Sequence, residues 1–260
     1  MTLKNQIILL SFIVLFLSLI GSVALNFILF NAANSYYRQV NDTRLDPLGL
    51  DVYPSAENSP KQTSDRPTVV FFGDSRAASW PVPAQIDRFE FINRGIGAQT
   101  TAQVIQRYDR HVAPLNPDIL VVQVGVNDLK TIPLFPKRKD EIIDRCKANI
   151  QTIIAEARQQ NATIIISTIF PLGKLPVERQ FFWSEEVDLA IKEVNEFIEG
   201  LAASDVLIFP TQPILAGDRA VVKDEYQFDF LHVNETGYEA LNQQLVPLLQ
   251  TIELEGKVEN

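Results

Sequence analysis

Three short runs of almost uninterrupted apolar residues constrain the fold of this chain most strongly. They read TVVFF, ILVVQV and TIIIST, and they begin at Thr68, Ile119 and Thr163. A strand with one solvated face alternates apolar and polar residues, whereas a strand covered on both faces is apolar throughout. The runs therefore predict interior strands of a parallel sheet with helices on both sides.

Segments of helical period separate these runs and two shorter ones. We expect strands at Thr68–Phe72, Phe89–Asn93, Ile119–Val124, Thr163–Ile169 and Val206–Phe209. The clearest helices are expected at residues 140–160, 184–203 and 234–249, the last with Asn234 as its N-cap and disturbed by Pro247. This alternation predicts an α/β fold, a three-layer doubly wound sandwich with a mainly five-stranded parallel sheet.

Ligands of such folds bind beyond the carboxyl ends of the strands, so the residues that follow each strand are site candidates. They read GDSR from Gly73, NRGIGAQTT from Asn93 and GVND from Gly125, and a long loop after the last strand ends with Asp229 and His232. Together they offer a hydroxyl, an imidazole, carboxylates and amide donors. This combination favours acyl transfer by a serine nucleophile, with a base, an orienting carboxylate and donors to an oxyanion.

The chain has two histidines, and only one suits the role of a base. His111 stands at a helix end before the third strand, which places it at the opposite edge of the sheet, in contact with free helix carbonyls. His232 follows Asp229 by three residues, so in a tight turn the carboxylate reaches Nδ1 and leaves Nε2 facing the nucleophile. Ser75 on its own could equally be a helix N-cap. Two histidines so far apart disfavour a zinc site, and we expect no metal and no cofactor.

Four blocks of the sequence resemble those of the SGNH hydrolases, also called GDSL esterases and lipases. The blocks are FFGDSR, NRGIGAQTT, VGVNDL and DFLHVNETGY, and they occur in the expected order between about residues 67 and 249. The resemblance implies the flavodoxin-like SGNH fold and hydrolysis of carboxylic esters. It also implies that Ser75 is the nucleophile, that Asp229 and His232 complete a triad, and that Asn127 donates its side-chain amide to the oxyanion.

The sequence departs from the family pattern at two places. The oxyanion glycine of the second block aligns with Ala98, so the expected backbone donors are the N–H of Ser75 and that of Gly97 or Ala98. An alanine is tolerated there if its φ is negative. Arg76 stands where an apolar residue is usual. It could contact an anionic substrate, but we favour an ion pair at the surface or between loops.

The stretch from Ile7 to Phe30 contains no charged residue. As a helix it would be about 36 Å long, enough to cross a hydrocarbon core of about 30 Å. We favour an uncleaved signal anchor after a short tail at residues 1–6, with the rest of the chain outside the cytoplasm. The alternative is a signal peptide cleaved after Ser22-Val23-Ala24, which would release a secreted protein.

The segment that follows the apolar stretch changes in composition. Residues 31–66 are rich in Asn, Ser, Asp and Pro and are expected to form a polar linker. A partly apolar piece, Tyr36, Tyr37 and residues 45–53, could instead pack on the domain. Residues 67–252 are the expected hydrolase domain, and residues 253–260 a C-terminal tail.

Composition narrows the partners. The formal net charge of −9 disfavours nucleic acid, because such binding needs Lys and Arg to neutralise phosphates. The single cysteine, Cys146, shares a helical stripe with isoleucines and is interpreted as a core residue. Phe182 and Trp183, after the fourth strand, could line a pocket for an acyl chain or a sugar, or anchor their loop in the core.

These observations favour serine-dependent hydrolysis of an acyl or acetyl ester by a membrane-anchored enzyme. The expected substrate is a small-molecule, lipid or glycan ester. An O-acyltransferase or O-acetyl esterase that acts on cell-surface polysaccharide is one alternative. A non-catalytic, tethered binding module is the other.

Overall fold

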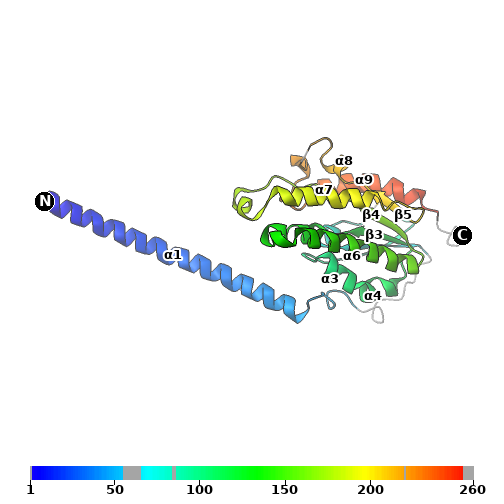
Figure 1. Ribbon diagram of the computed structural model, residues 1–260, viewed down its shortest axis with the longest axis horizontal. Coiled ribbons are helices and arrows are strands. Elements are labelled where there is room, and N and C mark those ends of the chain that lie inside the picture. Colours follow the sequence, from blue (N-terminus) through cyan, green and yellow to red (C-terminus); the bar gives the residue numbers. More distant parts are fainter. Residues whose placement is uncertain (1, 55–65, 84–85, 220, 254–260) are drawn as a thin grey trace. The chain divides into compact units, whose positions relative to one another are not determined.

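The structure is a computed structural model that describes residues 2–54, 66–83, 86–219 and 221–253. The chain divides into two compact units, Met1–Pro47 and Leu48–Asn260. Figure 1 shows the long helix of the first unit and the sheet and helices of the second. All candidate site residues belong to the second unit.

The second unit is built on a five-stranded sheet with the order β2-β1-β3-β4-β5. All four neighbouring pairs are parallel, and the register places Gly73 beside Gly95 and Gln123. The strands are β1 (Thr68–Gly73), β2 (Glu90–Gly95), β3 (Ile119–Gln123), β4 (Thr163–Ser167) and β5 (Val206–Phe209). The α/β fold class is confirmed. Because the strand order reverses at β1, the crevice beside its carboxyl end is the expected ligand site of this topology.

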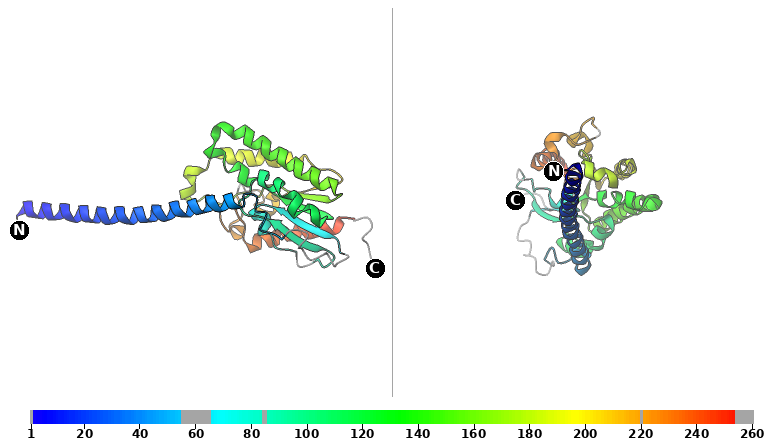
Figure 2. Two further views of the ribbon diagram at one scale, coloured as in Figure 1. Left: turned by 90° about the horizontal axis from the view of Figure 1, so that it is seen from below. Right: turned by 90° about the vertical axis from the view of Figure 1, so that its left-hand side faces the viewer.

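Alternate residues of the strands face two separate cores. Val70, Phe72 and Leu120 pack with α3 (Thr101–Gln106), α4 (Tyr108–His111), α6 (Lys139–Gln159) and α7 (Glu185–Glu199). Their neighbours Val69, Phe71 and Ile119 pack with α9 (Glu235–Thr251) on the other side (Figure 2). Coverage of both faces explains why these strands are apolar throughout.

Short helices occupy the connections between these elements. Asn234 caps α9 as expected, since its Oδ1 accepts from the N–H of Gly237 at 3.0 Å. The short α-helices are α2 (Ser75–Ala78), α5 (Val126–Leu129) and α8 (Gln212–Leu215). The 3-10 helices are η2 (Ala113–Leu115), η3 (Ile132–Leu134), η4 (Pro136–Arg138), η5 (Val177–Phe182) and η6 (Asp224–Tyr226).

The first unit contains a 43-residue helix, α1 (Leu3–Leu45). Among the described residues it is the one helix that is long and apolar enough to cross a membrane. It does not end near Phe30 but continues into the segment that was expected to be a linker. There Asn41 Nδ2 and Thr43 Oγ1 donate to carbonyls four residues earlier, at 2.7 and 2.9 Å. The helix ends shortly before Pro47, since a proline disfavours helical geometry in the residue that precedes it.

The linker expected at residues 31–66 therefore has three parts. Residues 31–45 are helical, residues 48–54 belong to the second unit, and residues 55–65 lie outside the described residues. Polar side chains that favour turns are compatible with a helix where they bond back to its carbonyls, which is why composition alone did not predict the extension. Of the expected C-terminal tail, residues 254–260 also lie outside the described residues.

Candidate active site

The turn after β1 presents Ser75 at the carboxyl edge of the sheet. Gly73 has a φ of +154°, and a Cβ at this position would collide with the carbonyl oxygen of Gln123 in the neighbouring strand. Asp74 then caps α2, because its Oδ1 accepts from the N–H of Arg76 at 2.9 Å. Asp74 thus takes the capping role considered for Ser75, which leaves the serine hydroxyl for another partner.

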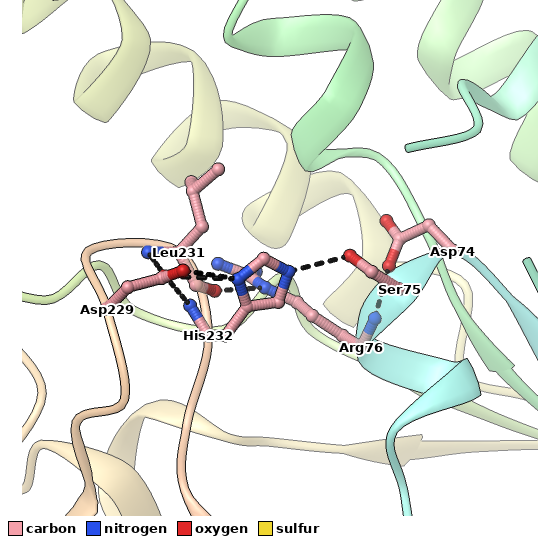
Figure 3. A network of polar contacts seen from close by, with 6 residues as sticks. All are labelled: Asp74, Ser75, Arg76, Asp229, Leu231 and His232. Atoms are coloured by element: carbon pink, nitrogen blue, oxygen red, sulfur yellow. Dashed lines mark hydrogen bonds and ion pairs between the residues drawn. The ribbon is translucent and has the colours of Figure 1, made fainter. Parts of the chain in front are cut away.

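That partner is the imidazole of His232, in the loop before α9. Ser75 Oγ lies 2.9 Å from His232 Nε2, and His232 Nδ1 lies 2.9 Å from Asp229 Oδ2 (Figure 3). Asp229 Oδ1 also accepts from the backbone N–H groups of Leu231 and His232, both at 2.7 Å. The tight turn orients carboxylate and ring together, so serine, imidazole and carboxylate form one chain of contacts.

The surroundings of Asp229 favour its charged form. Burial raises the pKa of this carboxyl, but the hydrogen bonds from the His232 ring and from two backbone N–H groups outweigh burial and lower the pKa below 3.8. A carboxylate beside Nδ1 favours the His232 tautomer that carries its proton there, which leaves Nε2 free to accept one. The His232 side chain is 31% exposed, so a small molecule can reach the pair.

Two segments near Ser75 carry the donors expected for an oxyanion. Gly97 lies in the turn after β2, where an added Cβ would be 3.9 Å from the Cβ of Ser75. Asn127, in α5, is 3% exposed, and its Nδ2 donates to the carbonyl of Gln99 at 2.9 Å. An amide nitrogen carries two N–H groups, so this bond uses only one of them.

Ala98, beside Gly97, differs from the expectation. Its φ is +62°, in the left-handed region, so the condition under which an alanine is tolerated here, a negative φ, is not met. The left-handed conformation costs a residue with a Cβ about 1–2 kcal/mol and costs glycine almost nothing. The turn therefore keeps the backbone shape of a glycine turn, and contacts around it must hold the alanine in place.

The sequence model of the GDSL-like Lipase/Acylhydrolase family matches residues 63–240, which include Ser75, Asn127, Asp229 and His232. The chain belongs to this family. Its GDSL block reads GDSR here, so Arg76 is the residue that departs from the pattern after the serine. None of the curated proteins compared with the chain matches it significantly.

Solved structures share the fold of this GDSL-like chain at low identity. It is similar to a putative platelet activating factor from Streptococcus pneumonia, with 20% identity and a TM-score of 0.64 over 83% of this chain and 99% of that one. A GDSL-like lipase from Bacteroides thetaiotaomicron VPI-5482 gives 18% identity and a TM-score of 0.58 over 75% and 93%. An acetyl xylan esterase gives 20% identity and a TM-score of 0.56 over 70% and 99%. Structural similarity at such low sequence identity shows that these proteins share the fold of this chain.

Arg76 is buried in this GDSL-like domain, with 0% exposure, so the expectation of a surface position is wrong. Its Nε donates to the carbonyl of Leu231 at 2.8 Å and its Nη1 to that of Phe170 at 3.2 Å. The guanidinium carbon lies 5.1 Å from the centre of the Phe170 ring. Arg76 does bridge loops, but through carbonyls rather than an ion pair, and it offers no surface to an anionic substrate.

The charges of Asp74 and Arg76 are both buried beneath the site. Burial raises the pKa of the Asp74 carboxyl to about 6, although Arg76 opposes this shift. Burial lowers the pKa of Arg76 to about 10, which leaves the guanidinium charged near neutral pH. In the part of the chain that the structure describes, no three His, Cys, Asp or Glu side chains gather as metal ligands would.

The aromatic residues after β4 lie beside the histidine loop. Trp183 is partly buried, packs against the core on the α6 and α7 side, and meets the ring of Phe230 edge-on at 5.4 Å between centroids. Phe230 precedes Leu231 and His232, so Trp183 supports the loop that carries the imidazole. This contact favours the anchoring interpretation of Trp183, while the side chain of Phe182 lies outside the described residues.

Sequence reasoning missed two buried polar residues near the site. Arg107 is 0% exposed, and its Nη2 donates to the carbonyl of Gly73 at 2.8 Å and its Nη1 to that of Arg94 at 2.7 Å. Arg107 Nε donates to Gln99 Oε1 at 2.6 Å. Arg107 thus joins the ends of β1 and β2 to the turn that holds Gly97 and Ala98. Nothing in the local pattern distinguishes these residues from solvated polar ones.

Proposed function

We propose that the chain hydrolyses a carboxylic ester with Ser75 as the nucleophile. Ser75 Oγ attacks the ester carbonyl while His232 Nε2 takes its proton, and Asp229 holds the ring and stabilises the imidazolium. The alcohol leaves with a proton from His232, and a water then releases the acyl group from Ser75 by the same route. The observation that carries this proposal is the 2.9 Å contact between Ser75 Oγ and His232 Nε2.

The proposal assigns the oxyanion to three donors. They are the backbone N–H of Ser75, that of Gly97 or Ala98, and the side-chain amide of Asn127. Each donor contributes about 3–4 kcal/mol to lowering the barrier in enzymes where one has been removed. Two observations support the assignment. Gly97 lies beside Ser75, and the bond from Asn127 to the carbonyl of Gln99 uses only one of the two N–H groups of the Asn127 side chain.

We also propose that α1 anchors the catalytic unit in a membrane, with that unit outside the cytoplasm. The length and apolar character of α1 support an anchor. A cleaved signal peptide is the competing proposal. The mass of the mature chain distinguishes the two, because cleavage removes the apolar stretch.

Hydrolysis of a short-chain nitrophenyl ester tests the catalytic proposal. Ser75→Ala is expected to lose at least about a thousandfold in kcat, because the nucleophile is gone. Ser204→Ala, which removes an exposed hydroxyl from the turn before β5, serves as the matched control and should keep full activity. Equal activity of the two variants, or no activity in the wild type, contradicts the proposal, the latter in favour of a binding module.

Deacetylation of a polysaccharide is the second candidate, because an acetyl xylan esterase is among the similar solved structures. In that case Ser75, His232 and Asp229 act on an acetyl ester of a sugar. In an acyltransferase, a sugar hydroxyl instead of water would take the acyl group from Ser75. Hydrolysis rates measured across a series of acyl lengths distinguish an acetyl esterase from a lipase, because the rate of an acetyl esterase falls steeply for acyl groups longer than acetyl. Acyl transfer to a glycan, measured against hydrolysis, separates a transferase from both.

A further inference from the structure

Residues 48–53, called the strap below, follow α1 in the chain and belong to the same compact unit as the sheet. The strap lies against the oxyanion loop, defined as residues 95–99. Gln99 Nε2 donates to the carbonyl of Leu48 at 2.8 Å, and the Tyr53 hydroxyl donates to the carbonyl of Gly95 at 2.5 Å. The strap thus holds both ends of the oxyanion loop.

The other side of the strap is tied to the end of α4. The carbonyl of Leu50 accepts from Arg110 Nε at 3.1 Å and lies 3.2 Å from His111 Nε2. The ring of Tyr53 meets that of His111 edge-on at 5.4 Å, and the guanidinium carbon of Arg94 lies 4.7 Å from the centre of the Tyr53 ring. His111, which the triad does not use, therefore serves to hold the strap.

Gly49 shows how closely the strap approaches the loop. Its φ is +66°, and a Cβ there would be 2.9 Å from Ile96 Cδ1 and 3.2 Å from Gln99 Nε2. Both the backbone conformation and the space favour glycine at this position. Gly49 is itself buried, so the contact is a packed interface rather than a loose crossing.

Gln99 connects the strap to the proposed oxyanion donors. Its side chain is 5% exposed, donates to Leu48 and accepts from Arg107, while its backbone carbonyl accepts from Asn127. Gln99 also follows Ala98, whose left-handed φ persists only if its neighbours fix it. One residue therefore links the strap, the strained turn and the amide of Asn127.

We infer that the strap, acting through Gln99, positions the oxyanion donors of the active site. The residues directly after the membrane helix then support catalysis and are more than a spacer. Gln99 and Tyr53 are positioning residues in this account, since they act on the donors and not on the substrate. The inference rests on the proposed serine mechanism.

Two substitutions in the full-length chain test whether the strap positions the oxyanion donors or only stabilises the fold. Gln99→Glu keeps the acceptor for Arg107 but removes the donor to Leu48, and Tyr53→Phe removes only the hydroxyl that bonds to Gly95. Matched controls are Gln106→Glu, which adds the same charge at an exposed site, and Tyr36→Phe, which removes an exposed hydroxyl from α1. Long incubation with a fluorophosphonate counts the active sites in each preparation, so that kcat is expressed per site.

Gln99→Glu and Tyr53→Phe are each expected to lose about tenfold or more in kcat per site, while KM changes by less than about twofold, because oxyanion donors act mainly in the transition state. Both controls should match the wild type. Combining Tyr53→Phe with Asn127→Ala should cost less than the product of the single losses, because both changes affect the same donors.

An unchanged kcat per site in both variants, with a lower melting temperature, would overturn the inference and leave the strap a stabilising element only. Multiplicative losses in the double variant would also contradict it. If the wild type is neither labelled nor active on esters, the proposed function itself fails, and the strap inference fails with it.

Discussion

Arg76 Nε donates to the backbone carbonyl of Leu231 at 2.8 Å, which ties the residue after Ser75 to the residue before His232. The two halves of the proposed catalytic pair lie 157 residues apart in the chain, and the contact between Ser75 and His232 is partly buried. The bond from Arg76 to Leu231 is also partly buried, and because it lies one residue away from each partner it is well placed to fix their separation. This explains the presence of a buried charge where an apolar side chain is usual.

Arg76→Leu is expected to weaken both the fold and the reaction. The carbonyl of Phe170, in a buried bond, and that of Leu231, in a partly buried one, both lose their donor. A buried unsatisfied group costs about 1–3 kcal/mol, so the free energy of unfolding should fall by about that amount. The kcat should fall as well, because the histidine loop loses its tie to the nucleophile helix. Urea unfolding and ester hydrolysis measure the two effects.

Arg145→Leu is the control for this change. Arg145 is exposed, and solvent screens its ion pair with Glu141, so the change should leave the free energy of unfolding almost unaltered. If Arg76→Leu and Arg145→Leu have the same free energy of unfolding and the same kcat, Arg76 does not hold the histidine loop to the nucleophile helix.

Ala98→Gly is expected to stabilise the protein. It relieves the left-handed strain at φ +62°, and after the greater freedom of glycine in the unfolded chain is subtracted, a gain of about 0.5–1 kcal/mol remains. The matched change Ala102→Gly, inside α3, should lower the free energy of unfolding by about the same amount, because glycine weakens a helix. Losses of stability in both variants would show that Ala98 is not strained.

Asp74 gives stability a specific pH dependence. Its pKa is about 6 in the folded chain against 3.8 ordinarily, so the folded state binds this proton more tightly than the unfolded state. The contribution is fully present below about pH 3.8 and is lost as the pH rises through about 6. Asp74→Asn cannot titrate, so the free energy of unfolding of the wild type should fall relative to that variant by up to about 3 kcal/mol across this window.

Urea unfolding at a series of pH values measures that difference. Asp218→Asn, a change at an exposed carboxylate, is the control. Its free energy of unfolding should change with pH in the same way as that of the wild type. A wild-type curve parallel to that of Asp74→Asn would mean that the buried carboxyl carries no such shift.

Much of the fold could be predicted because its signals are local. An apolar run such as TVVFF reports coverage of both strand faces, and the residues after each strand fall at one edge by topology alone. The close spacing of Asp229 and His232 likewise predicted the geometry of their turn. The pairing of Ser75 with His232 could be predicted from the rule that the carboxyl ends of parallel strands lie at one edge of the sheet.

The remaining features depend on tertiary contacts that leave no local pattern. Arg76, Gln99 and Arg107 are polar residues in polar stretches, and nothing in their neighbours reveals that loops close over them. The sequence left the φ of Ala98 open, because alanine ordinarily adopts a negative φ and only the packing around the turn imposes the left-handed conformation. The strap was considered as one of two outcomes, since its apolar residues alone do not say what they contact.

The identity of the labelled residue after reaction with a fluorophosphonate tests the central claim most directly. Mass spectrometry of the digested protein should locate one label on Ser75. Labelling should be absent in Ser75→Ala, much slower in His232→Ala, and unchanged in Ser204→Ala. A label that persists in Ser75→Ala at wild-type stoichiometry would contradict the assignment of Ser75 as the nucleophile.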